Sequence, residues 1–353
     1  MLFTLLGTVC ALSALLALPS LAGRLGGLAV PGITLGAGPV LWDGLLGHRQ
    51  VTVRMLPLGV STSTLPLPVR LLGPRLYLAH LAAFAATLAA GAGAAAAGGD
   101  GGFRFAVGLL PIYLLLVLGQ ARHPLTTGWV LFLMPFRSAL LGRLTVHPAE
   151  LAAGAALDRG DAARAAALLA ARPAGTPDGL HGHRIRAGVA LARGDYAQAA
   201  REAVAACEAV ADPKAAVSVR MLLAAALTGA AESGELPAAE YLPRLRDTAA
   251  RVREGHRAAL PYFPLAAELA LAEGRRDAAV RAARKAAGLA FNPFWRAQAE
   301  CTHAAALASV GRTDEARAAL ERARTAMPAL ARIAVVAGRM ELLVVTEARP
   351  VSP

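Results

Sequence analysis

The chain has 353 residues, of which 56% are hydrophobic, and its mean hydropathy is +0.48. A soluble protein of this size is less apolar, so the composition indicates membrane-spanning segments. The net charge of +12 fits an anionic membrane surface, whereas the 5% aromatic content and the absence of a lysine- or arginine-rich run argue against nucleic-acid binding. Three widely separated cysteines without a CxxC pair argue against a disulfide framework and a zinc knuckle.

Three apolar runs predict membrane-spanning helices, at about 2–23, 77–97 and 105–121. A cleaved signal peptide is the alternative for 2–23, but no basic residue precedes its apolar run. A shorter run, 129–141, is interrupted by a proline and an arginine. We interpret it as interfacial, or as partly buried against the other helices.

Arginines gather in 24–75, between the first two predicted spans, and occur again from Arg122 onward. The positive-inside rule places both regions in the cytoplasm. We therefore expect an integral protein of a bacterial-type plasma membrane with its C-terminal half in the cytoplasm. Within 24–75, two β-prone stretches flank Gly-rich turn residues, which predicts a hairpin at about 28–60.

The motifs of this half resemble, in order and spacing, the membrane core of the site-2 proteases, which are intramembrane zinc metallopeptidases. That family follows its metal-binding helix with Ala-Arg-x-x-Gly, a Gly-Phe-Gly-Pro turn, a hairpin and Pro-Leu-Gly-Gly. The matching positions here read Gly23-Arg24-Leu25-Gly26-Gly27, Gly36-Ala37-Gly38-Pro39 and Pro57-Leu58-Gly59-Val60. The resemblance covers about 1–145 and implies that 77–97 is the second core helix.

The resemblance also implies where a zinc site would lie, and the residues there cannot form one. The family's His-Glu-x-x-His motif, which supplies two ligands and the general base, falls on Leu15, Leu16, Ala17, Leu18 and Pro19. The third ligand, an aspartate, is replaced by Thr127. Zinc sites in proteins use Cys, His, Asp or Glu. We therefore expect no catalytic residue, no metal and no cofactor.

Histidines elsewhere in this half do not replace the missing ligands. His80 lies inside the second predicted span, where an ionisable group is a functional candidate by default. The simpler interpretation is a neutral, hydrogen-bonded histidine. His48 and His123 lie beside arginines and are interpreted as solvated or as facing the lipid headgroups. No carboxylate is near any of the three in sequence, so no set of three zinc ligands is evident.

Residues 146–346 predict a helical repeat domain, followed by a frayed tail, 347–353. Five glycines recur at intervals of 34, 40, 40 and 37 residues, and an alanine follows each of them five residues later: Gly160, Gly194, Gly234, Gly274 and Gly311. Each glycine would let the chain reverse at a helix end. Four acids would then cap the next helix: Asp161, Asp195, Asp277 and Asp314.

This pattern resembles the tetratricopeptide repeat, most closely from Gly194 to Ala199, and predicts five helical pairs. A generic Ala-rich helical domain is the alternative. Solenoids of this kind bind peptides or proteins on their concave surface. His181 and His183 form a weak candidate metal pair for which no third ligand is evident.

The predicted fold class is mainly α, with polytopic membrane helices and a small β-hairpin followed by an α-solenoid of tetratricopeptide-like pairs. The expected function is that of a catalytically inactive site-2-protease-like membrane protein presenting a cytoplasmic scaffold for protein–protein interaction. Its expected partners are the lipid bilayer and a protein or peptide, not nucleic acid. Two alternatives stay open: an active intramembrane metallopeptidase with unconventional ligands, and a simple membrane-anchored tetratricopeptide adaptor.

Overall fold

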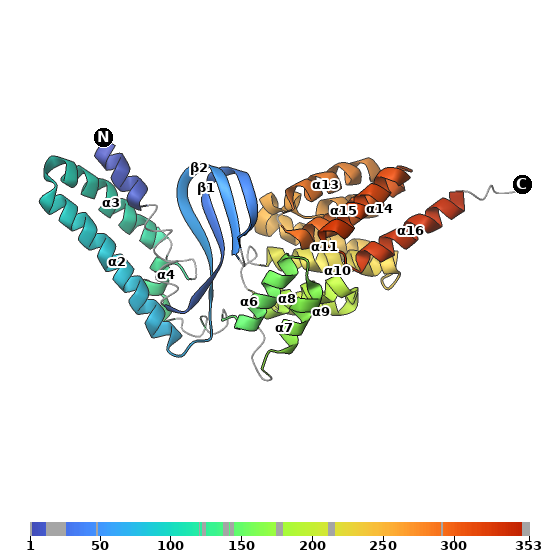
Figure 1. Ribbon diagram of the computed structural model, residues 1–353, viewed down its shortest axis with the longest axis horizontal. Coiled ribbons are helices and arrows are strands. Elements are labelled where there is room, and N and C mark those ends of the chain that lie inside the picture. Colours follow the sequence, from blue (N-terminus) through green and yellow to red (C-terminus); the bar gives the residue numbers. More distant parts are fainter. Residues whose placement is uncertain are drawn as a thin grey trace, which may run out of the picture. The chain divides into compact units, whose positions relative to one another are not determined.

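The protein is mainly helical with a small sheet, and it divides into two compact units, Met1–Pro148 and Ala149–Pro353 (Figure 1). The computed structural model describes residues 2–11, 26–46, 49–119, 121, 125–136, 141, 145–173, 179–210, 216–290 and 292–347.

Two helices of the first unit, α2 (Leu72–Ala97) and α3 (Gly99–Gly119), are long and apolar enough to cross a membrane. Only 22% and 28% of their most apolar windows are buried. Large side chains such as Leu115 therefore remain exposed, at 72% of its surface. Lipid would accommodate this apolar surface, whereas water would not. Of the expected span 2–23, only Leu2–Ala11 is described, and it is helical; 12–23 lies outside the described residues.

The helix Leu2–Ala11 packs closely against α3 through glycines. A Cβ added to Gly7 would lie 2.2 Å from the carbonyl oxygen of Phe105, and one added to Gly108 would lie 2.2 Å from that of Thr4. Small residues allow such close helix contact where the hydrophobic effect does not drive helices together. Below this contact, Ala11 is buried with side chains of α3.

The expected interfacial segment 129–141 forms short helices where it is described. These are α4 (Thr127–Phe132) and η2 (Met134–Phe136), and neither is long enough to cross a membrane. Trp129 and Met134 are buried in one cluster with Leu76 of α2. The segment is therefore held against the end of α2.

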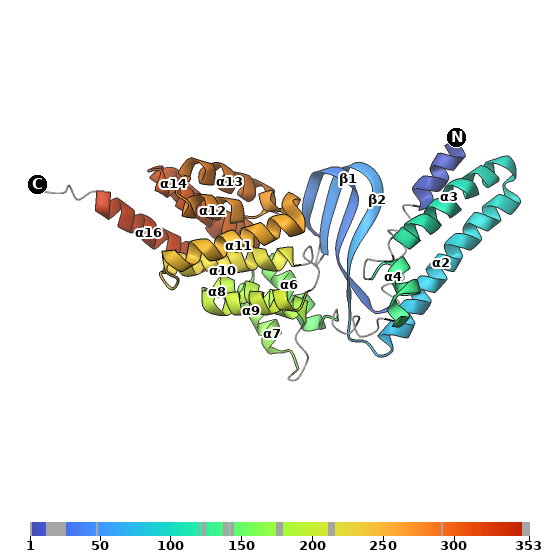
Figure 2. The ribbon, with the colours of Figure 1, turned by 180° about the vertical axis from the view of Figure 1, so that it is seen from behind.

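The sheet consists of two long antiparallel strands, β1 (Leu28–Leu46) and β2 (Arg49–Pro66). Leu35 is paired with Val60 on one side and with Val53 on the other, so each strand bends back on itself (Figure 2). The bends fall near Gly36, whose φ is +89°, and between the two paired positions of β2. The expected hairpin is thus a longer, doubled ribbon, and the Gly36–Pro39 and Pro57–Gly59 motifs lie at its bends rather than in one turn.

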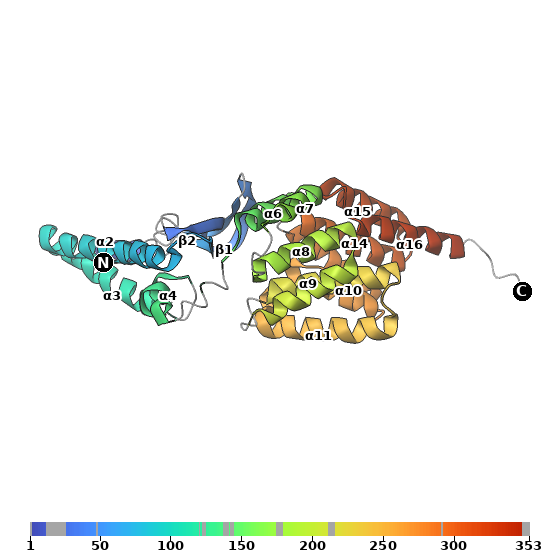
Figure 3. The same cartoon turned by 90° about the horizontal axis from the view of Figure 1, so that it is seen from below.

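From Pro148 onward the described chain is helical. The elements are α6 (Pro148–Asp158), α7 (Ala162–Ala170), α8 (Leu180–Arg193), α9 (Tyr196–Glu208), α10 (Val217–Ser233), α11 (Ala238–His256), η3 (Arg257–Tyr262), α12 (Leu265–Ala272), α13 (Arg276–Leu289), α14 (Pro293–Ser309), α15 (Thr313–Ala326) and α16 (Arg332–Glu347). From α7 onward, consecutive helices pack against each other, as Figure 3 shows for α8 to α11. In addition α8, α10, α12, α14 and α16 contact one another in turn, and α16 also contacts α10.

The recurring glycines end helices as predicted. All five have φ between +75° and +86°, a conformation that a side chain disfavours. The predicted caps are half right: Asp161 and Asp195 accept bonds from the backbone of the next helix, whereas Asp277 and Asp314 lie inside its first turn. The alanines five residues on are buried except Ala239, which is exposed because α11 begins four residues after its glycine rather than two.

Candidate functional site

Thr127, which the resemblance to site-2 proteases would align with the third zinc ligand, lies against His80. The side chains are buried, and His80 Nδ1 is 3.2 Å from Thr127 Oγ1. Thr127 is held there because Thr126 begins α4, its hydroxyl accepting a bond from the Trp129 amide. His80 Nε2 has no hydrogen-bond partner among the described residues. The fold thus joins two candidates that are 47 residues apart in sequence.

This pair does not fit a zinc ion. One imidazole and one neutral hydroxyl fall short of the three or four ligands that zinc sites use. Leu15, Leu16 and Pro19 lie outside the described residues, and their side chains carry no ligand atom. Within the described part of the chain, no group of three or more His, Cys, Asp or Glu side chains is placed to hold a metal. No step of metal chemistry follows from these residues.

The His181 and His183 pair is built into a network of ion pairs. His183 Nδ1 lies 2.8 Å from Glu202 Oε2, and Arg186 contacts the same carboxylate at 3.0 Å. Burial, assisted by Arg184, lowers the pKa of His181 to about 3. The two histidines therefore face different surroundings and do not form the metal pair considered from the sequence.

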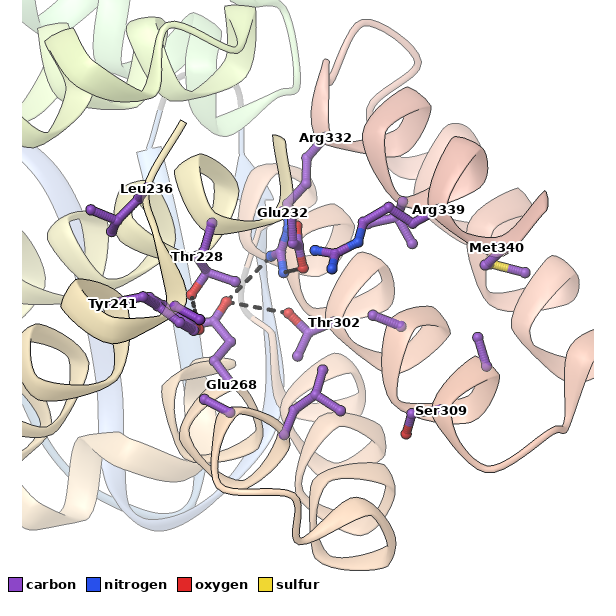
Figure 4. Close-up of a pocket in the computed structure, with 17 residues that line it drawn as sticks. Thr228, Glu232, Leu236, Tyr241, Glu268, Thr302, Ser309, Arg332, Arg339 and Met340 are labelled. Carbon is purple, nitrogen blue, oxygen red and sulfur yellow. Dashed lines mark hydrogen bonds and ion pairs between the residues drawn. The ribbon is translucent and has the colours of Figure 1, made fainter. Parts of the chain in front are cut away.

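The second unit contains a cavity of about 320 Å³ between α10, α11, α12, α14 and α16 (Figure 4). Its wall is mostly apolar and includes Leu236, Leu271, Val336 and Met340. Its polar lining comes from Thr228, Glu232, Tyr241, Glu268, Thr302, Ser309, Arg332 and Arg339. A mostly apolar cavity with a few convergent polar groups is the usual form of a ligand site.

Arg332 forms the polar end of this cavity. It is the first residue of α16, is fully buried, and binds both oxygens of Glu232 on α10 at 2.7 Å. Its Nη1 also donates to Glu268 of α12 and to Gln298 of α14, at 3.2–3.3 Å. One guanidinium therefore connects three helices to α16, as the dashed lines in Figure 4 show in part.

The cluster holds two carboxylates and one guanidinium with little exposure to solvent: the side chains of Arg332, Glu232 and Glu268 are 0%, 9% and 1% exposed. Burial disfavours the charged form of Arg332, but Glu232 and Glu268 outweigh it and hold the pKa of Arg332 well above its usual value. Burial raises the pKa of Glu268, and Arg332 opposes this rise. Glu268 Oε1 is bound by Thr302 at 3.3 Å, whereas its Oε2 has no partner among the described residues.

The polar groups of the cavity are bonded largely to one another. Neither histidine nor cysteine is among its lining residues, and the carboxylate of Glu268 accepts a bond from the Thr302 hydroxyl while it is paired with Arg332. Ser309 donates to the carbonyl of Ala306, and Thr228 is paired with Tyr241 at 3.1 Å. Arg339 is exposed and points toward the charged cluster in Figure 4, which adds a cation to the cavity.

Sequence reasoning did not single out Glu232, Glu268 or Arg332. One signal was present: Glu268 interrupts the apolar run of α12, Leu265–Ala272, and a charge on an apolar helix face needs a partner. The sequence does not show which residue is that partner, because Arg332 lies 64 residues further along the chain.

No family model matches the chain, and no curated protein or solved structure matches it either. The likeness to site-2 proteases and to tetratricopeptide repeats therefore rests on the sequence motifs alone.

Proposed function

We propose that the protein is a membrane-anchored scaffold in which a non-catalytic, site-2-protease-like unit carries a cytoplasmic solenoid of tetratricopeptide-like pairs. The solenoid binds a protein or peptide partner in the cavity between α10, α11, α12, α14 and α16. The observation that carries this proposal is the cavity itself, a mostly apolar chamber with a charged end. Apolar side chains of a partner would be buried there, and the charged end would select among partners.

The arrangement of helices supports a solenoid. Each predicted pair turns at a glycine with positive φ, and the first helix of each pair from α8 onward contacts the first helix of the next. Between α8 and α14 this is the neighbour-to-neighbour packing of a repeat array, in which one layer of helices forms a continuous inner surface, and α16 closes that layer by contacting α10 as well as α14. The cavity lies on that layer, because α10, α12, α14 and α16 all line it.

The non-catalytic interpretation is supported by the donor set at His80 and Thr127 and by the apolar residues 15–19. The alternative of a working metallopeptidase has no set of ligands in the described chain to favour it. The alternative of a simple anchor does not account for a doubled ribbon whose bends coincide with Gly36–Pro39 and Pro57–Gly59.

Filling the cavity should abolish partner binding. We expect Ala305→Trp, on the partly exposed wall of the cavity, to reduce the yield of partner crosslinked to a photoreactive residue at Leu236 at least tenfold. The measurement is in-cell photo-crosslinking of the full chain, with the captured partner identified by mass spectrometry. Ala318→Trp on the exposed face of α15 is the matched control and should leave the yield unchanged. Equal yields from both variants would refute binding in the cavity.

Purified full-length protein should contain far less than one zinc ion per chain. We expect elemental analysis of protein prepared in detergent without chelators to find no stoichiometric zinc, because one imidazole and one hydroxyl do not hold the ion. His80→Ala should leave the metal content unchanged. Stoichiometric zinc that disappears in His80→Ala would favour the metallopeptidase alternative instead.

A further inference from the structure

The exposed side of α13 carries cations that the proposed function does not use. Arg281, Arg284 and Lys285 are exposed and are spaced three and four residues apart, so they share one side of the helix. The opposite side, with Ala279 and Ala283, is buried. Together with Arg312, at the start of α15, the three cations line a depression of about 360 Å³. We call Arg281, Arg284 and Lys285 the α13 cationic face.

Neighbouring carboxylates neutralise these three cations only in part, since Glu315 interacts electrostatically with Arg284. Glu315 binds Arg312 at 2.5 Å, and Asp277 is the one carboxylate among the described residues that line the depression. No ion pair to Arg281, Arg284 or Lys285 occurs within the part of the chain that is described. Other exposed arginines of this unit do have partners, for example Arg251 with Asp247 and Arg246 with Glu273. Three exposed cations without an ion pair among the described residues therefore lie together on α13.

We propose that the α13 cationic face binds the anionic headgroups of the membrane into which α2 and α3 insert. A chain anchored by these helices keeps its second unit close to the headgroups, so even a weak patch meets them at a high effective concentration. Each lysine or arginine near an anionic surface strengthens binding about fivefold, so three act together strongly. This inference requires the membrane anchor but is independent of partner binding in the cavity.

The chain offers a direct probe of this contact, because it contains only two lysines, Lys214 and Lys285. Full-length protein would be placed in nanodiscs of phosphatidylcholine alone, or of phosphatidylcholine with 30% phosphatidylglycerol. Lysine acylation would then be followed by mass spectrometry, with Lys214 as the internal reference. We expect Lys285 to react several-fold more slowly relative to Lys214 in the anionic discs, and 0.5 M salt to remove the difference.

Two variants separate this contact from a general effect of charge. Arg281→Gln/Arg284→Gln should abolish the protection of Lys285, whereas Arg201→Gln/Arg253→Gln removes the same charge from exposed positions on α9 and α11 and should preserve it. Equal reactivity of Lys285 in the two lipid compositions would overturn the proposal. So would equal protection by inorganic phosphate in neutral discs, which would identify a small-anion site, or protection by RNA or an acidic protein but not by anionic lipid.

Discussion

Replacing Arg332 with methionine is expected to lower the free energy of unfolding of the second unit by about 3–5 kcal/mol. The change removes the cation that now contacts both the buried Glu268 and the mostly buried side chain of Glu232. Removing one member of a buried ion pair costs more than the pair itself contributes, because the remaining charge is left in a medium of low polarity. Hydrogen exchange of the α14 amides, measured in the full chain, would report this loss.

The same variant should recover stability as the pH falls from 7 toward 5. Burial already raises the pKa of Glu268, and without Arg332 only the hydrogen bond from Thr302 opposes that rise. A carboxyl group whose pKa is higher in the folded state binds its proton more tightly there, so acid favours folding over the range between the unfolded and folded pKa values. The free energy of unfolding of the variant should therefore increase on acidification, and an Arg332→Met/Glu268→Gln double variant should lose most of this pH dependence.

Arg251→Met provides the control, since its ion pair with Asp247 is more than half exposed on both sides. We expect no measurable change in the exchange of α14, because exposed pairs contribute little. If Arg332→Met were as stable as Arg251→Met at pH 7, the charged end of the cavity would be a polar, water-filled site, and the connection of three helices through Arg332 would be wrong.

The features that could be predicted from the sequence are those that depend on interactions between residues close together in the chain. The five glycine turns were predictable because a positive φ at a helix end depends on the glycine itself and a few neighbours. The prediction that Asp277 caps α13 was wrong by two residues. The cap position is Arg275 and α13 begins at Arg276, so Asp277 lies within the first turn. Helix boundaries differ by this much according to local hydrogen bonds that composition does not reveal.

The candidate sites were much harder to predict, because each joins distant segments. The contact of His80 with Thr127 spans 47 residues, and that of Arg332 with Glu232 spans 100. Both depend on how one helix returns to another, which the periodicity of each helix alone does not determine. His80 and Thr127 could be named individually, by their place in an apolar run and in a family motif. The sequence around Arg332 does not distinguish it from the other arginines, because its role depends on the packing of α16 against α10.

Alanine at Gly108 should destabilise the first unit, whereas alanine at Gly93 should not. A Cβ at Gly108 would lie 2.2 Å from the Thr4 carbonyl oxygen, and at Gly93 it would meet nothing within 4 Å. Because the obstacle is backbone, the helix Leu2–Ala11 would have to move away from α3, and forced overpacking of this kind costs about 1–3 kcal/mol. At the exposed Gly93, alanine only raises helix propensity. Thermal unfolding of the full chain in detergent would compare the two variants.

A substitution at Gly7 tests whether the loss of stability in Gly108→Ala comes from the contact between the helix Leu2–Ala11 and α3. Gly7→Ala places a Cβ 2.2 Å from the Phe105 carbonyl oxygen in the same contact, so it should lower the melting temperature as Gly108→Ala does. Once either alanine has displaced the helix, the other has little left to disrupt, and the double variant should lose less than the sum of the single variants. Full additivity, or a Gly108→Ala variant that melts together with Gly93→Ala, would show that Leu2–Ala11 does not pack on α3 through these glycines.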